Sequence, residues 1–217
     1  METGERYQTR DHLLDAAEEL FADGGIEQTT VRAITQRAGA NLAAVNYYFG
    51  SKEGLVREVF ARRIAPINDG RVRLLERALS KTTVKIRDVI HAFVSPAIEM
   101  LMANPEEGRN FVRLMGRMHM DPDPRHRSLA TENFEEIVER FVGAMQLALP
   151  GLGREEIFWR FHLAVGTFAQ AVSCGHMLEW FTDGECRMDD PDEITERVVT
   201  FIVGGFRAKS PRIGRRS

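Results

Sequence analysis

The apolar residues of this chain recur at helical spacing along almost its whole length. Steps of three and four residues place apolar side chains on one face of a helix. In the first such segment this face is formed by Leu13, Leu14, Ala17, Leu20 and Phe21. The period-two alternation that marks β-strands is missing from the sequence. The pattern therefore predicts an all-α fold of about nine helices.

Turn and capping residues divide the first 65 residues into a three-helix domain and the start of a fourth helix. Glycine ends helices because it adopts the left-handed conformation of a C-cap. Ser, Thr and Asn start helices because their side chains accept a hydrogen bond from a free backbone N–H. The expected ends are Gly24-Gly25 and Gly39, and the expected caps are Thr29 or Thr30, Asn41 and Ser51.

Beyond residue 65 the helical segments lengthen. Pro66 is expected to kink or end the fourth helix, because proline cannot donate the intrahelical hydrogen bond. Further helices are expected near residues 84–103, 106–119, 126–149, 154–182 and 191–208, with breaks at turns that contain Pro or Gly. The predicted organisation is a first domain over 1–65, a larger helical domain over 66–208, and a disordered basic tail over 209–217.

The composition is that of a core-forming globular protein, with 43% hydrophobic and 28% charged residues. No stretch approaches the roughly 18 uncharged apolar residues of a membrane-spanning helix. The N-terminus lacks the apolar run of a signal peptide. We therefore expect a cytoplasmic protein with no membrane partner. Cys174 and Cys186 fit neither a disulfide framework nor a zinc spacing, so we expect two reduced thiols.

Two short helices joined by the turn AGAN (38–41) carry the clearest chemistry. A turn of this length with a glycine is typical of a helix-turn-helix, whose second helix enters the major groove of DNA. The second helix, LAAVNYY (42–48), has small residues that allow close approach to base edges. Its Asn and two Tyr side chains reach bases and phosphates. Lys52 follows at a helix start, where backbone amides and an ammonium group together hold a phosphate.

The run TTVRAITQRAGANLAAVNYYFGSKEGL (29–55) resembles the DNA-binding head of the TetR family of bacterial regulators. The matching parts are the pattern of the second helix, the AG turn, the Tyr-x-Phe ending of the third helix and the Ser-Lys-Glu start of the fourth. The resemblance implies an all-α homodimer whose head precedes a larger helical domain that binds a small molecule. It also implies DNA contacts from Thr30, Arg32, Leu42, Ala43, Ala44, Asn46, Tyr47, Tyr48 and Lys52.

Chemistry supports these implied roles unevenly. Arg32 can bind guanine, and Asn46 can bind adenine, each through a pair of hydrogen bonds. Each such pair is worth on the order of 1–3 kcal/mol in discrimination against other bases. Ala43 reaches at most a thymine methyl group, and Lys52 adds affinity with little sequence preference. One of the two adjacent tyrosines is expected to pack in the core. A solvated surface charge is the alternative reading of Arg32.

Overall charge gives no sign of nucleic-acid binding. The net charge is −3, and residues 1–65 contain eight Lys and Arg against ten Asp and Glu. DNA binding by such a head requires that the first helix carry its acids away from the DNA.

The second domain is rich in Met and aromatic residues, which suit either an ordinary core or an adaptable apolar cavity. Embedded basic residues can receive a ligand carboxylate, although a His in a helical core is more often structural. The segments FVRLMGRMH and EEIFWRFHLAVGTF are similar to the ligand domain of the PsrA-like branch of the family. That likeness implies a fatty acid or acyl effector, with drug-like, aromatic and steroid effectors left open. The candidate pocket residues are Phe111, Arg113, Met115, Met118, His119, Phe134, Trp159, His162, Phe168 and His176.

The two long C-terminal helices, near 154–182 and 191–208, carry apolar stripes that predict a dimer interface. In the family this interface is a symmetric four-helix arrangement, and a two-fold dimer presents its heads to successive major grooves of a palindrome. The candidate interface residues are Ala164, Phe168, Ala171, Val172, Ile194, Val198, Phe201 and Ile202.

These features favour a ligand-responsive repressor that binds a palindromic operator as a dimer and leaves it when a small, largely apolar effector binds. An activator or dual regulator stays open. The sequence lacks a phosphate loop, a nucleophile elbow, HExxH and a metal-ligand cluster, so we expect no enzyme, metal or cofactor. A helical ligand-binding or scaffold protein whose head does not bind DNA is the second alternative. The net negative charge of residues 1–65 supports it, whereas Arg32, Asn46, Tyr48 and Lys52 oppose it.

Overall fold

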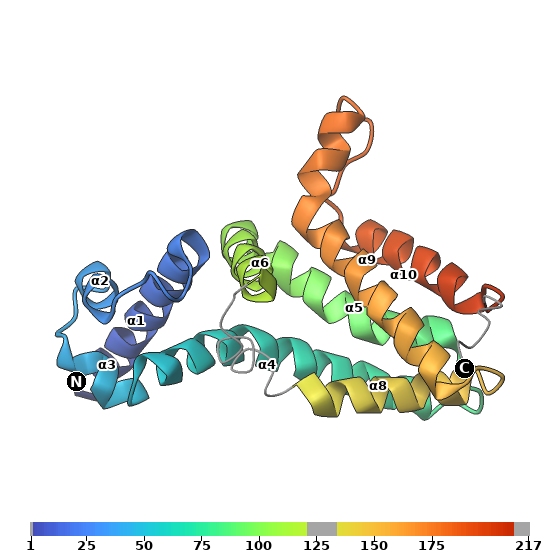
Figure 1. The fold of residues 1–217 in the computed structure, drawn as a ribbon, viewed down its shortest axis with the longest axis horizontal. Helices are drawn as coiled ribbons and strands as arrows, with labels where there is room; N and C mark the ends of the chain where they lie inside the picture. The colour runs from blue at the N-terminus through green and yellow to red at the C-terminus, as the bar shows by residue number, and fades with distance from the viewer. Residues whose placement is uncertain (1, 121–133, 211–217) are drawn as a thin grey trace, which may run out of the picture. The chain divides into compact units, whose positions relative to one another are not determined.

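The computed structural model describes residues 2–120 and 134–210, with side chains for 7–117 and 134–210. This part of the chain contains nine helices and no strand (Figure 1). The all-α prediction is therefore confirmed. The helices are α1 Glu2–Gly24, α2 Val31–Arg37, α3 Ala43–Phe49, α4 Lys52–Leu79, α5 Ile86–Ala103, α6 Pro105–Met120, α8 Phe134–Ala148, α9 Arg154–Phe181 and α10 Pro191–Arg207. Residues 126–133 of one predicted helix and 211–217 of the predicted tail lie outside the described residues.

Contacts between residues divide the chain into two compact units. The head unit comprises Met1–Ile67 with Ala103–Glu135, and the C-terminal unit comprises Asn68–Met102 with Glu136–Ser217. Helix α6 belongs to the head unit, where it packs against α1. The assignment of functions to residues 1–65 and 66–208 stays a prediction, since contacts alone carry no information on function.

The head unit is built on the apolar faces of its short helices. Each helix turns one stripe of residues inward, and burial of such stripes supplies most of the stability of short helices. The predicted inward face of α1 is buried apart from the half-buried Leu20. The buried residues include Leu13, Leu14, Ala17 and Phe21 of α1, Ile34 of α2, Val45 of α3, Leu55, Val59 and Phe60 of α4, and Phe111 and Leu114 of α6.

Side-chain caps predicted from the sequence start α2 and α4, whereas the N-cap of α3 is Leu42, whose side chain makes no cap hydrogen bond, and not the predicted Asn41. Thr30 Oγ1 accepts a hydrogen bond from the backbone N–H three residues on, at 3.1 Å. Asn41 Oδ1 accepts one from the N–H two residues on, at 2.9 Å. Ser51 Oγ accepts one from the N–H three residues on, at 3.1 Å. Of these bonds, that of Asn41 lies in the short turn between α2 and α3, where it restrains the start of α3.

Helix α4 does not end at Pro66, contrary to one of the two expected outcomes. It runs from Lys52 to Leu79 with this proline inside. Proline removes one intrahelical hydrogen bond, and buried residues on both sides, Ile64, Ile67 and Leu75, keep the helix in register. Helix α4 is consequently one continuous element that begins in the head unit and ends in the C-terminal unit.

The C-terminal unit packs α5, α8, α9, α10 and the second half of α4 around one apolar core. Phe93 of α5 lies at its centre. The ring of Phe93 has edge-to-face contacts with Phe141, Phe161 and Phe168, at centroid distances of 5.2, 5.0 and 6.5 Å. This geometry is the favoured one for aromatic pairs. It ties α5, α8 and α9 to one another.

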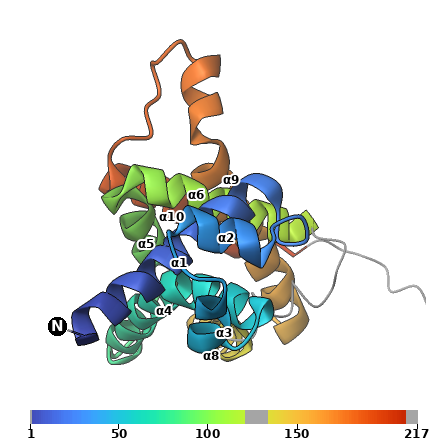
Figure 2. The same ribbon diagram turned by 90° about the vertical axis from the view of Figure 1, so that its left-hand side faces the viewer.

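Helix α9 departs from helical geometry at Cys174, where φ is −123° and ψ is 19°. Beyond this point the last turns of α9 and the connection to α10 extend away from the rest of the C-terminal unit (Figures 1 and 2). The connection folds back on these turns, and the backbone N–H of Met188 donates to Glu179 Oε1 at 3.2 Å. Trp180 and Phe181 are 72% and 69% exposed there. These two aromatic side chains therefore contribute little to the core of the unit.

Gly70 on α4 is expected not to tolerate a side chain. A Cβ atom at this position would lie 2.9 Å from Cβ of Pro96 on α5. Gly70→Ala is therefore expected to lower the free energy of unfolding by about 1–3 kcal/mol, as overpacking does, measured by urea denaturation. Gly143→Ala on α8 is the matched control, since a Cβ there meets nothing within 4 Å and alanine favours helix. Equal effects of the two substitutions would show that the close approach at Gly70 is unimportant.

Candidate nucleic-acid interface

Helix α3 presents one outward face of the head unit. Val45 is buried, and the outward face is formed by Leu42, Ala43, Asn46 and Tyr47, all exposed. Leu42 is 57% and Tyr47 is 65% exposed, although both are large side chains that folding normally buries. A short helix with a row of uncovered small, amide and aromatic side chains has the shape and chemistry of a major-groove reader.

The ends of α2 and α4 supply the other predicted DNA contacts. Thr30 and Arg32 are exposed at the start of α2. Lys52 at the start of α4 is half-buried, and its Nζ lies 3.4 Å from the backbone oxygen of Glu27. Tyr48 is half-buried and packs edge-on against Tyr47, with ring centroids 4.9 Å apart. Tyr48 is thus the more enclosed of the two tyrosines. Ala44 is half-buried on the flank of α3.

Charge within the head unit is segregated as DNA binding requires. Residues 31–52, which contain α2, the turn and α3, have three basic residues and no acidic one. Two acids of α1 pair outside this segment, since Asp15 and Glu18 bind Arg62 of α4 at 2.7 and 2.6 Å. A third, Glu19, pairs with Arg37 at the end of α2. Residues 31–52 thus carry no acid of their own, and Arg32 and Lys52 have no carboxylate partner among the ion pairs of the described residues, which weakens the argument against DNA binding.

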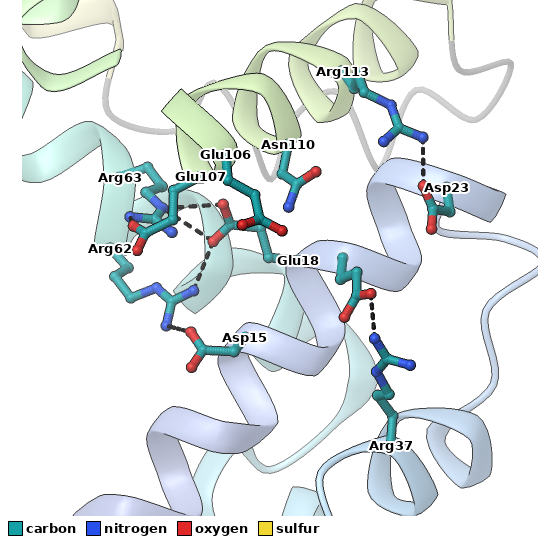
Figure 3. Close-up of a pocket in the computed structure, with 11 residues that line it drawn as sticks. Asp15, Glu18, Asp23, Arg37, Arg62, Arg63, Glu106, Glu107, Asn110 and Arg113 are labelled. Carbon is teal, nitrogen blue, oxygen red and sulfur yellow. Dashed lines mark hydrogen bonds and ion pairs between the residues drawn. The ribbon is translucent and has the colours of Figure 1, made fainter. Parts of the chain in front are cut away.

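Glu18 lies at the centre of an ion-pair cluster between α1, α4 and α6 (Figure 3). Its side chain is 4% exposed and accepts hydrogen bonds from both Arg62 and Arg63, the latter at 3.0 Å. Arg63 also pairs with Glu107 of α6. Burial alone lowers the pKa of Arg63, but its bonds to Glu18 and Glu107 outweigh burial, so this pKa is raised. The cluster borders a cavity of about 480 Å³ whose lining is formed by Asp15, Glu18, Glu19, Asp23, Arg37, Arg62, Arg63, Glu106, Glu107, Asn110 and Arg113.

Two arginines of α6, the predicted ligand anchor Arg113 and its neighbour Arg117, bind the end of α1. Arg113 pairs with Asp23. Arg117 donates from Nε to the backbone oxygen of Ala22 at 2.7 Å, and from Nη2 to that of Asp23. These oxygens lie in the last turn of α1, where the helix lacks its own donors. Both guanidinium groups therefore hold α6 to α1 in the head unit.

The predicted ligand-pocket residues do not form one cluster within either unit. Phe111 is buried in the head unit, where Met115 and Phe134 are half-buried and Arg113 is paired. Trp159, His162 and His176 are exposed on α9 of the C-terminal unit, and Phe168 alone adjoins its aromatic core. Met118 and His119 have side chains outside the described residues. The pocket assignment stays a prediction.

The predicted dimer residues divide into buried and exposed sets. Ala164, Ile194, Val198 and Ile202 are buried in the core of their own unit, which leaves them little surface for a partner. Phe168, Ala171 and Val172 are half-buried against the same core. Phe201 is 70% exposed on α10. The apolar period of these helices thus traces mainly the face that packs within the chain, and a dimer interface would use the outer face instead.

Cys174 and Cys186 are free thiols. No group of His, Cys, Asp and Glu in the part with described side chains is arranged to hold a metal ion. None of the described helices is both long and apolar enough to cross a membrane.

Sequence reasoning missed Arg71 and Ser95, two buried polar residues of the C-terminal unit. Arg71 falls four residues after Ile67 and four before Leu75, both buried, so the helical period placed it on the inward face of α4. This helical register is the signal from which the burial of Arg71 could have been predicted.

The helix-turn-helix and its uncovered face define a DNA-binding class of protein, and family models agree. The model for bacterial regulatory proteins of the tetR family matches residues 13–59. The model for the tetracyclin repressor-like C-terminal domain matches residues 91–205, more than half of the chain. The chain therefore belongs to the TetR family of DNA-binding transcriptional regulators, which are not enzymes.

Individual relatives match over shorter segments. The regulator SrpR of Pseudomonas putida is 31% identical over 90 residues, which cover 41% of this chain and 42% of SrpR. The repressor KstR2 of Mycolicibacterium smegmatis is 46% identical over 50 residues, or 23% of this chain and 24% of KstR2. The matched segments thus span less than half of these curated relatives.

Solved structures extend the likeness to nearly the whole fold. The regulator FadR from Bacillus subtilis, solved in complex with stearoyl-CoA, has a TM-score of 0.64 at 18% identity and covers 89% of this chain and 97% of its own. FadR from Bacillus halodurans has a TM-score of 0.65 at 16% identity, covering 93% and 97%. At such identities the likeness shows the fold alone.

Proposed function

We propose that this chain is a ligand-controlled repressor that binds a palindromic operator as a homodimer. A small, largely apolar effector releases it from the DNA. The observation that carries the DNA-reading part is the outward face of α3, on which Leu42, Ala43, Asn46 and Tyr47 are uncovered. The lack of acidic residues from 31 to 52 supports it. In this proposal the protein acts in the bacterial cytoplasm and associates with the nucleoid when DNA-bound.

Base and backbone contacts have different roles in the proposal. The side chains of Arg32 and Asn46 are exposed and can reach base edges in the major groove, so these two residues specify the DNA sequence. Thr30, Tyr47, Tyr48 and Lys52 contact the backbone and set the register of α3 on the duplex. Lys52 at the start of α4 combines its charge with the helix dipole at a phosphate.

Dimerisation is proposed through the outer faces of α9 and α10, which pack against each other. Trp159 and Leu163 on α9 are 60% and 63% exposed, and Phe201 on α10 is 70% exposed. Uncovered aromatic and leucine side chains are typical of the centre of a protein interface. A two-fold axis there would repeat each contact and would place two copies of α3 on a palindrome.

Effector control is proposed to act through α4, which is continuous between the two units. An effector that binds one arrangement of α4 more tightly than the other shifts the population toward it. The coupling free energy in such systems is typically about 1–3 kcal/mol. The complex of Bacillus subtilis FadR with stearoyl-CoA supports an acyl effector as the first class to test.

The DNA-reading proposal is tested by selecting bound sequences from a random duplex pool. Wild type is expected to enrich a palindromic site. Asn46→Ala is expected to relax selection at one base position per half-site, because it removes the two hydrogen bonds that distinguish adenine, worth about 1–3 kcal/mol. Lys52→Ala is expected to weaken binding to all sequences alike and to reduce its salt dependence.

The matched control is Gln28→Ala, an exposed position on the connection that precedes α2 and has no assigned contact. It should retain both the site and its affinity. Failure of wild type to enrich any sequence would refute DNA reading and would favour the helical ligand-binding alternative. Enrichment of a site without two-fold symmetry would refute the dimeric operator only.

A further inference from the structure

Arg71 of α4 is a buried cation with no carboxylate partner among the side chains that the structure describes. It is 5% exposed and lies within the C-terminal unit. Among the described residues no carboxylate oxygen comes within 4.0 Å of its guanidinium. Asp69, two residues earlier on α4, is exposed to solvent. Arg160 is the other buried arginine among the described side chains, and it pairs with the carboxylate of Glu156 at 2.7 Å.

The contacts of Arg71 hold its guanidinium in place but leave part of it unused. Nε donates to the backbone oxygen of Phe93 at 2.9 Å, and Nη1 donates to Asn68 Oδ1 at 3.2 Å. A guanidinium carries five N–H donors, and these two bonds use only Nε and one N–H of Nη1. Nη2 has no acceptor among the described residues. Among the described residues, Nη2 of Arg71 is not one of the buried side-chain atoms that lack a hydrogen-bond partner. Part of the Nη2 surface therefore remains accessible.

Burial without a counter-charge is unfavourable for this group. Desolvation lowers the pKa of Arg71 to about 10, which leaves the guanidinium charged at neutral pH. A hydrogen-bonded carbonyl, an amide and an aromatic ring stabilise a cation in part. They do not neutralise it, and proteins rarely bury an unpaired charge unless a partner arrives.

The surroundings of Arg71 are apolar and aromatic. Its Cζ lies 4.2 Å from the centroid of the Phe93 ring, whose other contacts are Phe141, Phe161 and Phe168. Phe168 is half-buried and is one of the residues predicted to line a pocket. A polar anchor therefore adjoins an aromatic cluster, which is the arrangement that an amphipathic ligand requires.

We infer that Arg71 binds the carboxylate of an amphipathic acid in the C-terminal unit. Nη1 and Nη2 form the fork that receives two carboxylate oxygens, and the apolar part of the ligand lies along the aromatic cluster. Asn68 and the Phe93 carbonyl are positioning groups that orient the fork. This inference rests on the proposed effector control of the same unit and names the chemical class of the effector.

Charge balance selects a monoanion over a phosphate. One unpaired guanidinium neutralises one carboxylate, whereas a phosphate monoester carries close to two negative charges at neutral pH. The second charge would be left without a partner in an apolar surrounding, and such a charge is strongly disfavoured. A neutral alcohol of the same length would leave the guanidinium unpaired.

The inference is tested by calorimetric titration of the full-length protein with three probes of equal chain length, decanoate, 1-decanol and decyl phosphate. Wild type is expected to bind decanoate about 10- to 100-fold more tightly than 1-decanol, in line with a charged hydrogen bond. Arg71→Gln is expected to remove that preference while 1-decanol affinity stays within about two-fold. Arg73→Gln, an exposed neighbour on α4, is the matched control and should behave as wild type.

Arg71→Lys keeps the charge but loses the fork, so it is expected to retain only part of the preference. It also supplies a folded variant if Arg71→Gln fails to fold, as judged by circular dichroism. Equal binding of decanoate and 1-decanol by wild type, no decanoate binding at all, or an unchanged preference in Arg71→Gln overturns the inference. Tighter binding of decyl phosphate than of decanoate overturns the choice of a carboxylate.

DNA binding by the same variants without probe separates this inference from the proposed function. If Arg71→Gln binds the selected operator but has lost the preference for decanoate, both hold. If wild type binds the operator without distinguishing the probes, the carboxylate site fails while DNA reading stands. If wild type prefers decanoate but enriches no DNA sequence, the site stands and the repressor proposal fails.

Discussion

Phe201→Asp is expected to convert the proposed dimer to monomers and to weaken operator binding at least 100-fold. Burial of a phenylalanine contributes about 1.5–3 kcal/mol, and a two-fold interface contains each residue twice. The substitution also forces a carboxylate into a desolvated position. Phe201 is 70% exposed within its own chain, so the fold of the monomer should be unaffected. Sedimentation velocity at micromolar concentration and fluorescence anisotropy on operator DNA measure the two effects.

Leu147→Asp on α8 is the matched control, because Leu147 is 66% exposed but lies outside α9 and α10. It should leave both the dimer and operator affinity unchanged. A Phe201→Asp protein that sediments as wild type would show that the outer face of α10 is not the interface. A dimer lost in both variants would point to a wider apolar surface that includes α8.

Glu18→Gln is expected to lower the free energy of unfolding by about 3 kcal/mol. Removal of one partner from a buried ion pair leaves the other charge without compensation, at a typical cost of about 3–5 kcal/mol. The low end applies because the Arg62 and Arg63 side chains are 25% and 16% exposed and water can partly solvate them. Urea denaturation followed by circular dichroism measures the loss.

Asp15→Asn is the matched control for Glu18. Asp15 pairs with the same Arg62 at 2.7 Å, but its side chain is 64% exposed, and exposed pairs contribute only about 0–1 kcal/mol. Its loss should therefore change the stability little. If both substitutions cost the same, the burial of Glu18 has no energetic consequence. If neither has a cost, the cluster of Figure 3 does not stabilise the head unit.

Local structure followed closely from the sequence. Helical spacing alone placed Leu13, Leu14, Ala17 and Phe21 on the buried face of α1, because a helix has one fixed period. The caps Thr30 and Ser51 start the expected helices, since capping is decided by a few adjacent residues. The predicted cap Asn41 lies one residue before Leu42, the N-cap of α3. The family followed from motifs in fixed register and is confirmed over residues 13–59 and 91–205.

The continuity of α4 through Pro66 did not follow from local rules. A proline inside a helix costs about 3 kcal/mol relative to alanine, and this cost can be read from the sequence. Burial of Ile64, Ile67 and Leu75, which lie on both sides of Pro66, stabilises the helix by more than this cost. The balance depends on contacts with distant residues, which the period of one helix does not reveal.

The roles of arginines were the least predictable from sequence. Arg113 was expected as a ligand anchor and pairs with Asp23, 90 residues away along the chain. Arg71 was overlooked, and of the two buried arginines among the described side chains it is the one without a carboxylate partner there. Whether a charge is paired depends on which residues of other helices reach it, so residue type and spacing do not decide it.

The sequence by itself determined the helices, two of the three predicted caps, the apolar stripe of each helix and the family, because these depend on the period of a helix and on neighbours within a few residues. The tertiary structure decided which apolar stripes face inward, which arginines are paired and which face of α9 and α10 stays uncovered. Each of these depends on contacts between residues far apart in the chain. The apolar period of α10 is the same whether it packs against its own unit or a partner, and only packing showed that Ile194, Val198 and Ile202 are enclosed while Phe201 is not.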